Sequence, residues 1–169
     1  FLTGSIPEFN SQAAYRIVRM SHNRLEGTIP RNLYANRQLE LIDLSFNQLK
    51  GGIGQQIVAA TKLSHLDLQH NQLDGQIPSR LSRLFDLRHV VLDSNELTGS
   101  IPASLRNLIA CETLGLSSNR LEGTIPTDLA RMDALRTLRL DSNPGLTGVV
   151  PASLAVKTVP LETLTVFNT

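Results

Sequence analysis

Apolar residues recur along the chain in a pattern that repeats every 24 residues. Between Leu63 and Pro78 the order is Leu-x-x-Leu-x-Leu-x-x-Asn-x-Leu-x-Gly-x-Ile-Pro, where x is variable. The asparagine of the pattern falls at Asn23, Asn47, Asn71, Asn95, Asn119 and Asn143. A fixed period of this length is typical of a solenoid, in which each repeat packs only against its neighbours. The pattern therefore predicts a repeat array.

Each block of the repeat predicts a local structure. The alternation in Leu66-Asp67-Leu68 indicates a short strand with its leucines inside and its aspartate outside. Stacked repeats then pair these strands in parallel, about 4.8 Å apart. The Ile-Pro segment ends extended pairing because proline lacks a backbone N–H, and the Leu-x-x-Leu that follows fits a short helical turn on the outer side. The fold class is α/β, with a parallel concave sheet and short helical turns on the convex side.

The asparagines are expected to form a structural ladder. Their side-chain amides can satisfy backbone groups where the chain turns inward after each strand. Losing one of them leaves buried backbone groups unpaired, so Asn95→Ala should cost on the order of 1–3 kcal/mol.

The blocks from Leu2 to Val166 resemble the plant-type leucine-rich repeat, Leu-x-x-Leu-x-Leu-x-x-Asn-x-Leu-x-Gly-x-Ile-Pro-x-x-Leu. That family includes ectodomains of plant receptor-like kinases and receptor-like proteins, and inhibitors of cell-wall polygalacturonases. The resemblance implies a second, irregular strand at Leu-x-Gly-x-Ile-Pro, a right-handed superhelix and a recognition function without catalysis. The chain departs from the family in lacking cysteine-paired caps and glycosylation sites. A third departure is Gly51, Gly52 and Gly54, which are expected to loosen the Ile-Pro segment of the second repeat.

Residues 1–169 are expected to form a single array of about six to seven repeats. The chain opens in mid-repeat and stops near a seventh strand, so we expect an uncapped, internal part of a longer protein. Thr169 falls where a seventh asparagine is expected. Flanking repeats or neighbouring subunits could pack on both open ends.

Composition excludes some functions and adds no others. The 16 basic and 15 acidic residues give a net charge of +1 and form no run of like charge, so neither nucleic-acid binding nor membrane contact by this segment is expected. The single cysteine, Cys111, stands at a core leucine position and is expected to be a small buried hydrophobe.

The variable strand positions form columns on the concave face, where side chains are not needed to fill the core. All four histidines lie in these columns, together with Phe46 and Phe167. Aromatic residues within a mosaic of charges are typical of interfaces. The predicted ligand-binding residues are Arg19, Asp43, Phe46, His65, Asp67, His70, His89, Asp93, Arg139 and Asp141. Because Asp93 is placed on this exposed face, Asp93→Ala is expected to be near neutral for folding.

Two sharper chemistries, metal binding and catalysis, compete with this interpretation. His65 and His89 share a column on adjacent strands with Asp67 beside them, which is a plausible zinc set. No fourth ligand is forced, so no metal site is expected, and no cofactor is expected. No nucleophile is flanked by a base and an orienting group, and a shallow exposed sheet would not exclude water, so the chain is not expected to be an enzyme.

The predicted function is non-catalytic recognition of a protein or peptide by a receptor-like or adhesive protein. The resemblance implies an extracellular or cell-surface location. One alternative is a structural or scaffolding subunit of a larger assembly, in an organelle or a membrane-associated complex. A second alternative is an inhibitor of a secreted cell-wall hydrolase.

Overall fold

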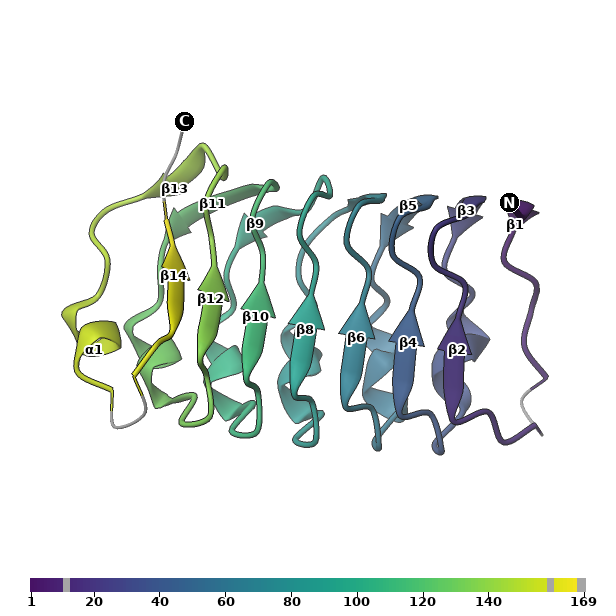
Figure 1. The fold of residues 1–169 in the computed structure, drawn as a ribbon, viewed down its shortest axis with the longest axis horizontal. Coiled ribbons are helices and arrows are strands. Elements are labelled where there is room, and N and C mark those ends of the chain that lie inside the picture. The colour runs from purple at the N-terminus through teal and green to yellow at the C-terminus, as the bar shows by residue number, and fades with distance from the viewer. Residues whose placement is uncertain (11–12, 158–159, 167–169) are drawn as a thin grey trace.

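A computed structural model describes residues 1–10, 13–157 and 160–166. Each repeat contributes a strand, a turn, a second strand in most cases, and a short helix before the next repeat begins (Figure 1). Phe167 and Thr169, which were assigned to a concave column and to the asparagine position, lie outside the described residues. None of the described helices has the length and apolar character needed to cross a membrane.

The principal sheet has seven parallel strands in chain order, as the stacked Leu-x-x-Leu-x-Leu blocks predict. Its strands are β2 (Ile17–Arg19), β4 (Leu41–Asp43), β6 (His65–Asp67), β8 (His89–Val91), β10 (Thr113–Gly115), β12 (Thr137–Arg139) and β14 (Thr163–Thr165). The register is one repeat per strand, so that Asp43 lies opposite Asp67 and His65 lies opposite His89. We call the outer side of this sheet the concave face.

The second, irregular strand implied by the repeat pattern is also present. It forms one sheet from β1 (Thr3–Ser5), β3 (Arg24–Thr28), β5 (Gln48–Gly52) and β7 (Gln72–Asp74), and another from β9 (Thr98–Ser100), β11 (Arg120–Thr124) and β13 (Gly145–Thr147). A single bridge between Gln76 and Thr98 links the two. The repeat glycines in these strands, such as Gly51 and Gly99, have φ near +73°, a conformation that other residues rarely adopt.

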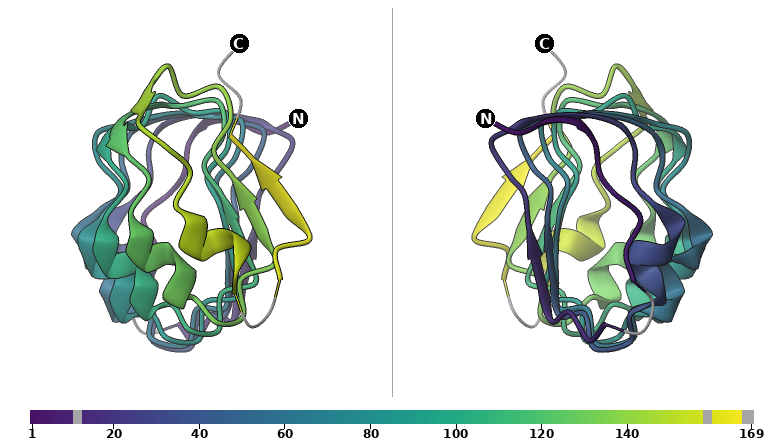
Figure 2. Two further views of the ribbon diagram at one scale, coloured as in Figure 1. Left: turned by 90° about the vertical axis from the view of Figure 1, so that its left-hand side faces the viewer. Right: turned by 90° about the vertical axis from the view of Figure 1, so that its right-hand side faces the viewer.

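Short helices close each repeat on the side opposite the concave face (Figure 2). They are the 3₁₀-helices η1 (Arg31–Ala35), η2 (Gln55–Ala59), η3 (Ser79–Arg83), η4 (Ala103–Asn107) and η5 (Thr127–Arg131), and the α-helical turn α1 (Ala152–Ala155). The expected loosening at the second repeat is wrong. Gly54 has φ −65° and ψ 142°, close to the −61° and 130° of Pro30, and β5 and η2 form as in the other repeats.

The core between the sheet and the helices is built from the leucines and isoleucines of the repeat. The asparagines tie consecutive repeats together along one edge of this core. The Asn95 Oδ1 accepts from the Leu73 N–H at 3.0 Å, and its Nδ2 donates to the Leu68 carbonyl at 3.0 Å, both in the preceding repeat. Asn47, Asn71, Asn119 and Asn143 form the same two bonds one repeat apart. This ladder sets the positions from which the concave side chains project.

Candidate functional site

An aromatic stack lies where three consecutive strands of the concave sheet turn toward the ladder. We define it as His22, Phe46 and His70, which directly precede the ladder asparagines and all have positive φ, between 52° and 55°. The Phe46 ring is 4.3 Å from the rings of both neighbours, with interplanar angles of 10° and 22°. A positive φ is unusual for such bulky residues, so the stack is held in place by the turn itself. Phe46 keeps 37% of its surface exposed.

The two histidines of the predicted site also pair. The ring centroids of His65 and His89 are 4.6 Å apart, and their Nδ1 atoms lie within hydrogen-bond distance of the Ser64 and Thr113 hydroxyls, respectively. Burial lowers the pKa of His65, and the nearby positive charge of His89 lowers it further. Across residues 1–10, 13–157 and 160–166, no three His, Cys, Asp or Glu side chains are grouped so that they could hold a metal ion. The structure therefore does not assemble the zinc set of His65, Asp67 and His89.

Two aspartates of this region bond mainly to side chains of their own or the preceding repeat. The Asp43 carboxylate accepts from the Ser45 hydroxyl at 2.7 Å and from the Ser21 hydroxyl at 2.9 Å. Asp67 accepts from the backbone N–H and the side-chain amide of Gln69, at 3.1 Å and 3.0 Å. Burial raises the pKa of Asp67, and the neighbouring charges of Asp43 and Asp93 add to the rise. Neither aspartate forms an ion pair with a described residue.

A pocket of about 270 Å³ opens on the concave face over β4, β6 and β8. Its walls include five of the predicted binding residues, and half-buried Leu41 and Val91 add apolar surface. The five are Arg19, Asp43, His65, Asp67 and His89. The concave pocket combines a cation, two carboxylates, two imidazoles and an apolar floor, which can bind both the backbone and the side chains of a peptide.

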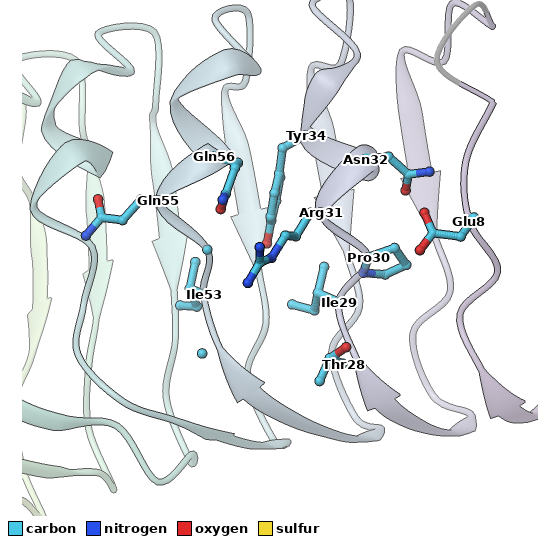
Figure 3. A pocket seen from close by; sticks show the side chains of 12 residues that line it. Glu8, Thr28, Ile29, Pro30, Arg31, Asn32, Tyr34, Ile53, Gln55 and Gln56 are labelled. Carbon is cyan, nitrogen blue, oxygen red and sulfur yellow. The ribbon is translucent and has the colours of Figure 1, made fainter.

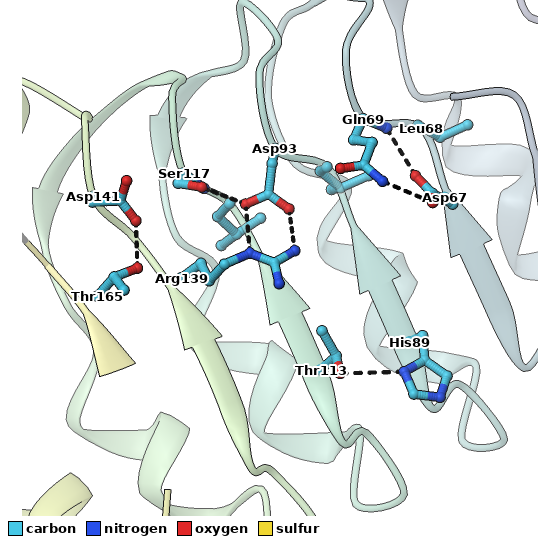
Figure 4. A network of polar contacts seen from close by, with 12 residues as sticks. Asp67, Leu68, Gln69, His89, Asp93, Thr113, Ser117, Arg139, Asp141 and Thr165 are labelled. Carbon is cyan, nitrogen blue, oxygen red and sulfur yellow. Dashed lines mark hydrogen bonds and ion pairs between the residues drawn. The ribbon is translucent and has the colours of Figure 1, made fainter. Parts of the chain in front are cut away.

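Asp93 does not belong to this open surface, which corrects the expectation from the sequence. Only 6% of Asp93 is exposed, and its carboxylate accepts from the Ser117 N–H at 3.0 Å and the Ser117 hydroxyl at 2.5 Å. Arg139, two repeats further on, donates to the same carboxylate at 2.6 Å and 3.2 Å (Figure 4). Because the Asp93 carboxylate is buried and is paired with the partly exposed Arg139, Asp93→Ala is now expected to destabilise the fold and not to be near neutral.

A glycine makes this long-range pair possible. Gly115 lies on β10, in the repeat between those of Asp93 and Arg139, and a Cβ at this position would come within 2.1 Å of Asp93 Oδ2 and 2.5 Å of Arg139 Nη2. The sequence contains a signal for this arrangement, because Gly115 stands at a column position where the other repeats carry larger side chains. Asp141, the last predicted residue, is bonded by the Thr165 hydroxyl of the next repeat.

Cys111 is buried in the core, as predicted from its leucine position. Burial raises the pKa of its thiol to about 12, so the nucleophilic thiolate is scarce at neutral pH.

This fold and this patterned concave face define a leucine-rich-repeat protein. The sequence profile described as Leucine rich repeat matches residues 85–144, and a second leucine-rich-repeat profile matches residues 62–84. A chain of the BIR3–SERK2 complex from Arabidopsis thaliana is 38% identical with a TM-score of 0.70, over 78% of this chain and 69% of that one. The receptor kinase SOBIR1 ectodomain from Arabidopsis thaliana is 33% identical with a TM-score of 0.74, over 79% and 72%. The chain belongs to the plant-type leucine-rich-repeat family, and it is similar to receptor-kinase ectodomains of that family.

Longer receptors also match. The plant peptide hormone receptor RGFR1, solved in complex with RGF2, is 35% identical with a TM-score of 0.88, over 91% of this chain. The match spans about a quarter of the receptor's own length, 25%. The comparison with curated proteins gave no match.

Proposed function

We propose that this chain is a non-catalytic recognition segment of a receptor-like protein and that it binds a peptide or protein on its concave face. Its location would be extracellular or at the cell surface, as for the receptor ectodomains that it resembles. The observation that carries the proposal is the concave pocket, in which Arg19, Asp43, His65, Asp67 and His89 meet although the core does not need them.

The aromatic stack extends this proposed surface along the same three repeats. Phe46 presents an exposed ring, and its neighbours His22 and His70 keep that ring in a fixed orientation. Rigid, partly exposed aromatic rings lose little conformational entropy on binding, which is why they recur at interfaces. RGFR1 was solved with the peptide RGF2 and BIR3 with SERK2, and these complexes support a peptide or protein as the ligand class.

The test is selection of binding peptides from a displayed random library, followed by affinity measurement against variants. Phe46→Ala should weaken the selected peptides by about tenfold or more, the range of an interface hot spot. His89→Ala should also weaken them, because it removes one wall of the concave pocket. Phe85→Ala is the matched control, since Phe85 is an exposed aromatic residue outside the concave sheet.

Equal losses from Phe46→Ala and Phe85→Ala would contradict the proposal. So would selected peptides whose affinity none of the concave variants changes. A scaffolding subunit would instead bind through its ends or its convex side, and such peptides would point to that alternative.

A further inference from the structure

A second pocket lies on the far side of the solenoid from the concave sheet, between η1 and η2 (Figure 3). It measures about 790 Å³. Its floor is apolar, formed by Ile29, Pro30 and Ile53, and its rim is polar. The polar residues that line it are Glu8, Thr28, Arg31, Asn32, Tyr34, Gln55 and Gln56, of which Tyr34 is buried. We call this the convex pocket.

The convex pocket exists because the second repeat breaks the Ile-Pro rule. Gly54 stands where the other repeats have a proline, and Tyr34 stands where later repeats have Val58, Ser82, Arg106 or Ala130. A Cβ at Gly54 would lie 3.9 Å from the Tyr34 ring and 2.6 Å from the Gln56 Oε1. The missing proline ring therefore makes room for a tyrosine against one wall and leaves the space beside it open. Since Gly54 keeps the backbone geometry of a proline, the exchange changes the surface and not the fold.

Four polar side chains of the convex pocket, those of Arg31, Tyr34, Gln55 and Gln56, are donors without partners among the described residues. The Tyr34 side chain is only 1% exposed, yet its Oη has no hydrogen-bond partner among the described residues. Burial raises the pKa of Tyr34, so the phenol keeps its proton and stays a donor. Within the described part of the chain, no ion pair or side-chain hydrogen bond engages Arg31, Gln55 or Gln56. Buried polar groups are normally paired, so the Tyr34 hydroxyl points to an acceptor that comes from outside the chain.

We propose that the convex pocket binds a carboxylate group, with Arg31, Tyr34 and the Gln55 and Gln56 amides as its donors. The planar Arg31 guanidinium matches a carboxylate with two parallel N–H bonds, and a phenol donates more strongly to a charged acceptor than to a neutral one. The Tyr34 Oη is covered in this structure, so the proposal requires neighbouring side chains of the convex pocket to move before a ligand can reach it.

Glu8 gives the site a direction. It lies at the opposite end of the convex pocket from Gln55, beside Asn32, which is held by two hydrogen bonds to the Phe9 backbone (Figure 3). Its negative charge repels a carboxylate and favours an N–H group at that end. The site is thus matched to a ligand that carries its carboxylate toward Arg31, as an acidic residue in a peptide or a free small acid can do.

The experiment is calorimetric titration of the chain with three probes at low salt. The probes are N-acetylated, C-amidated tetraglutamate, the matching tetraglutamine peptide, and N-acetylglutamate. Tetraglutamate should bind and tetraglutamine should not. Binding of N-acetylglutamate as well would show that a free small acid suffices, and binding of the peptide alone would show that the backbone contributes. Equal affinity for tetraglutamate and tetraglutamine would overturn the proposal.

Variants then separate this site from general attraction to a basic surface. Arg31→Gln should weaken tetraglutamate binding by about tenfold or more, since it removes a charge-assisted pair. Tyr34→Phe should weaken it by several-fold without lowering the melting temperature, because it removes only the unpaired hydroxyl. Glu8→Gln should strengthen it. Arg80→Gln, an exposed arginine on η3, is the matched control and should change nothing. Equal losses from Arg31→Gln and Arg80→Gln, or an unchanged affinity in Tyr34→Phe, would overturn the proposal.

Discussion

Asp67 ends strand β6 and Asp93 follows strand β8 in the next repeat, and the structure uses the two carboxylates in different ways. Among the described residues, the Asp67 carboxylate accepts hydrogen bonds only from Gln69 of its own repeat, and it lines the concave pocket. Asp93 is buried and bonded to the next two repeats, through Ser117 and Arg139. One carboxylate remains open to a ligand, and the other has become part of the scaffold.

The difference comes from residues one and two repeats away. Arg139 reaches back to Asp93 because Gly115, which lies between them, has no side chain to block the contact. The register places Val91 beside Asp67. None of the described arginines forms an ion pair with Asp67 in the way that Arg139 does with Asp93. On this basis we distinguish the part of the face around Asp67, which carries the proposed binding site and is called the recognition half, from the part around Asp93 and Arg139, which is called the braced half.

The largest expected effect is on folding, from Asp93→Ala. The change leaves the Arg139 guanidinium and the Ser117 hydroxyl without their acceptor, and should lower the free energy of unfolding by about 2–4 kcal/mol, somewhat reduced because Arg139 is partly exposed. Urea denaturation followed by circular dichroism measures it. Asp67→Ala is the matched control and should cost about 0.5 kcal/mol or less. Equal costs for the two variants would remove the distinction between the two halves.

A slightly smaller loss is expected from Gly115→Ala. The added methyl group would collide with Asp93 Oδ2 and Arg139 Nη2, so the ion pair must open, at a cost of about 2–3 kcal/mol. The double variant Gly115→Ala with Asp93→Ala sharpens the test, because both changes disrupt one network and their costs should not add. Strictly additive denaturation midpoints would mean that Gly115 does not act through Asp93.

The asparagine ladder should contribute equally to stability in the recognition half and in the braced half. Asn47 and Asn95 each accept a backbone N–H at 3.0 Å and donate to a carbonyl of the preceding repeat. Asn47→Ala and Asn95→Ala should therefore each cost about 1–3 kcal/mol through the unpaired backbone groups. Thermal or urea unfolding of the two variants gives the comparison. A clearly cheaper Asn47→Ala would show that the recognition half is also a looser scaffold.

Much of this architecture was predictable because it repeats. The strands, the second strands, the outer helices and the positions of the asparagines follow from a pattern in which every copy supports the next. The grouping of Asp43, His65, Asp67 and His89 was also predictable, since equal positions in adjacent repeats become neighbours in a parallel sheet.

The parts that could not be predicted depend on exceptions to the repeat. The Asp93–Arg139 pair joins residues 46 positions apart in different columns, so a column-by-column analysis separates them. Gly54 was interpreted as a weakness of the second repeat, because its match with the large Tyr34 side chain appears only once the two repeats are packed. The aromatic stack depends on a positive φ at Phe46, which no propensity for phenylalanine would suggest.

The smallest expected effect is a change in the titration of His65. Burial is the main cause of its lowered pKa and the charge of His89 is the next, so His89→Gln should raise the His65 pKa only part of the way toward its ordinary value. Ring-proton NMR signals followed across a pH titration measure the shift. His22→Gln is the control, because His22 belongs to the aromatic stack and should leave the His65 pKa unchanged.

The direction of this shift also sets how pH acts on the recognition half. Because the folded-state pKa of His65 lies below its unfolded value, the neutral ring supports folding above about pH 6.5, and this support is lost as pH falls toward the folded-state pKa. His89→Gln should make stability less sensitive to acid across that interval, whereas Asp93→Ala should lower stability without creating this dependence. An acid sensitivity that is unchanged in His89→Gln would show that the charge of His89 does not affect the protonation of His65.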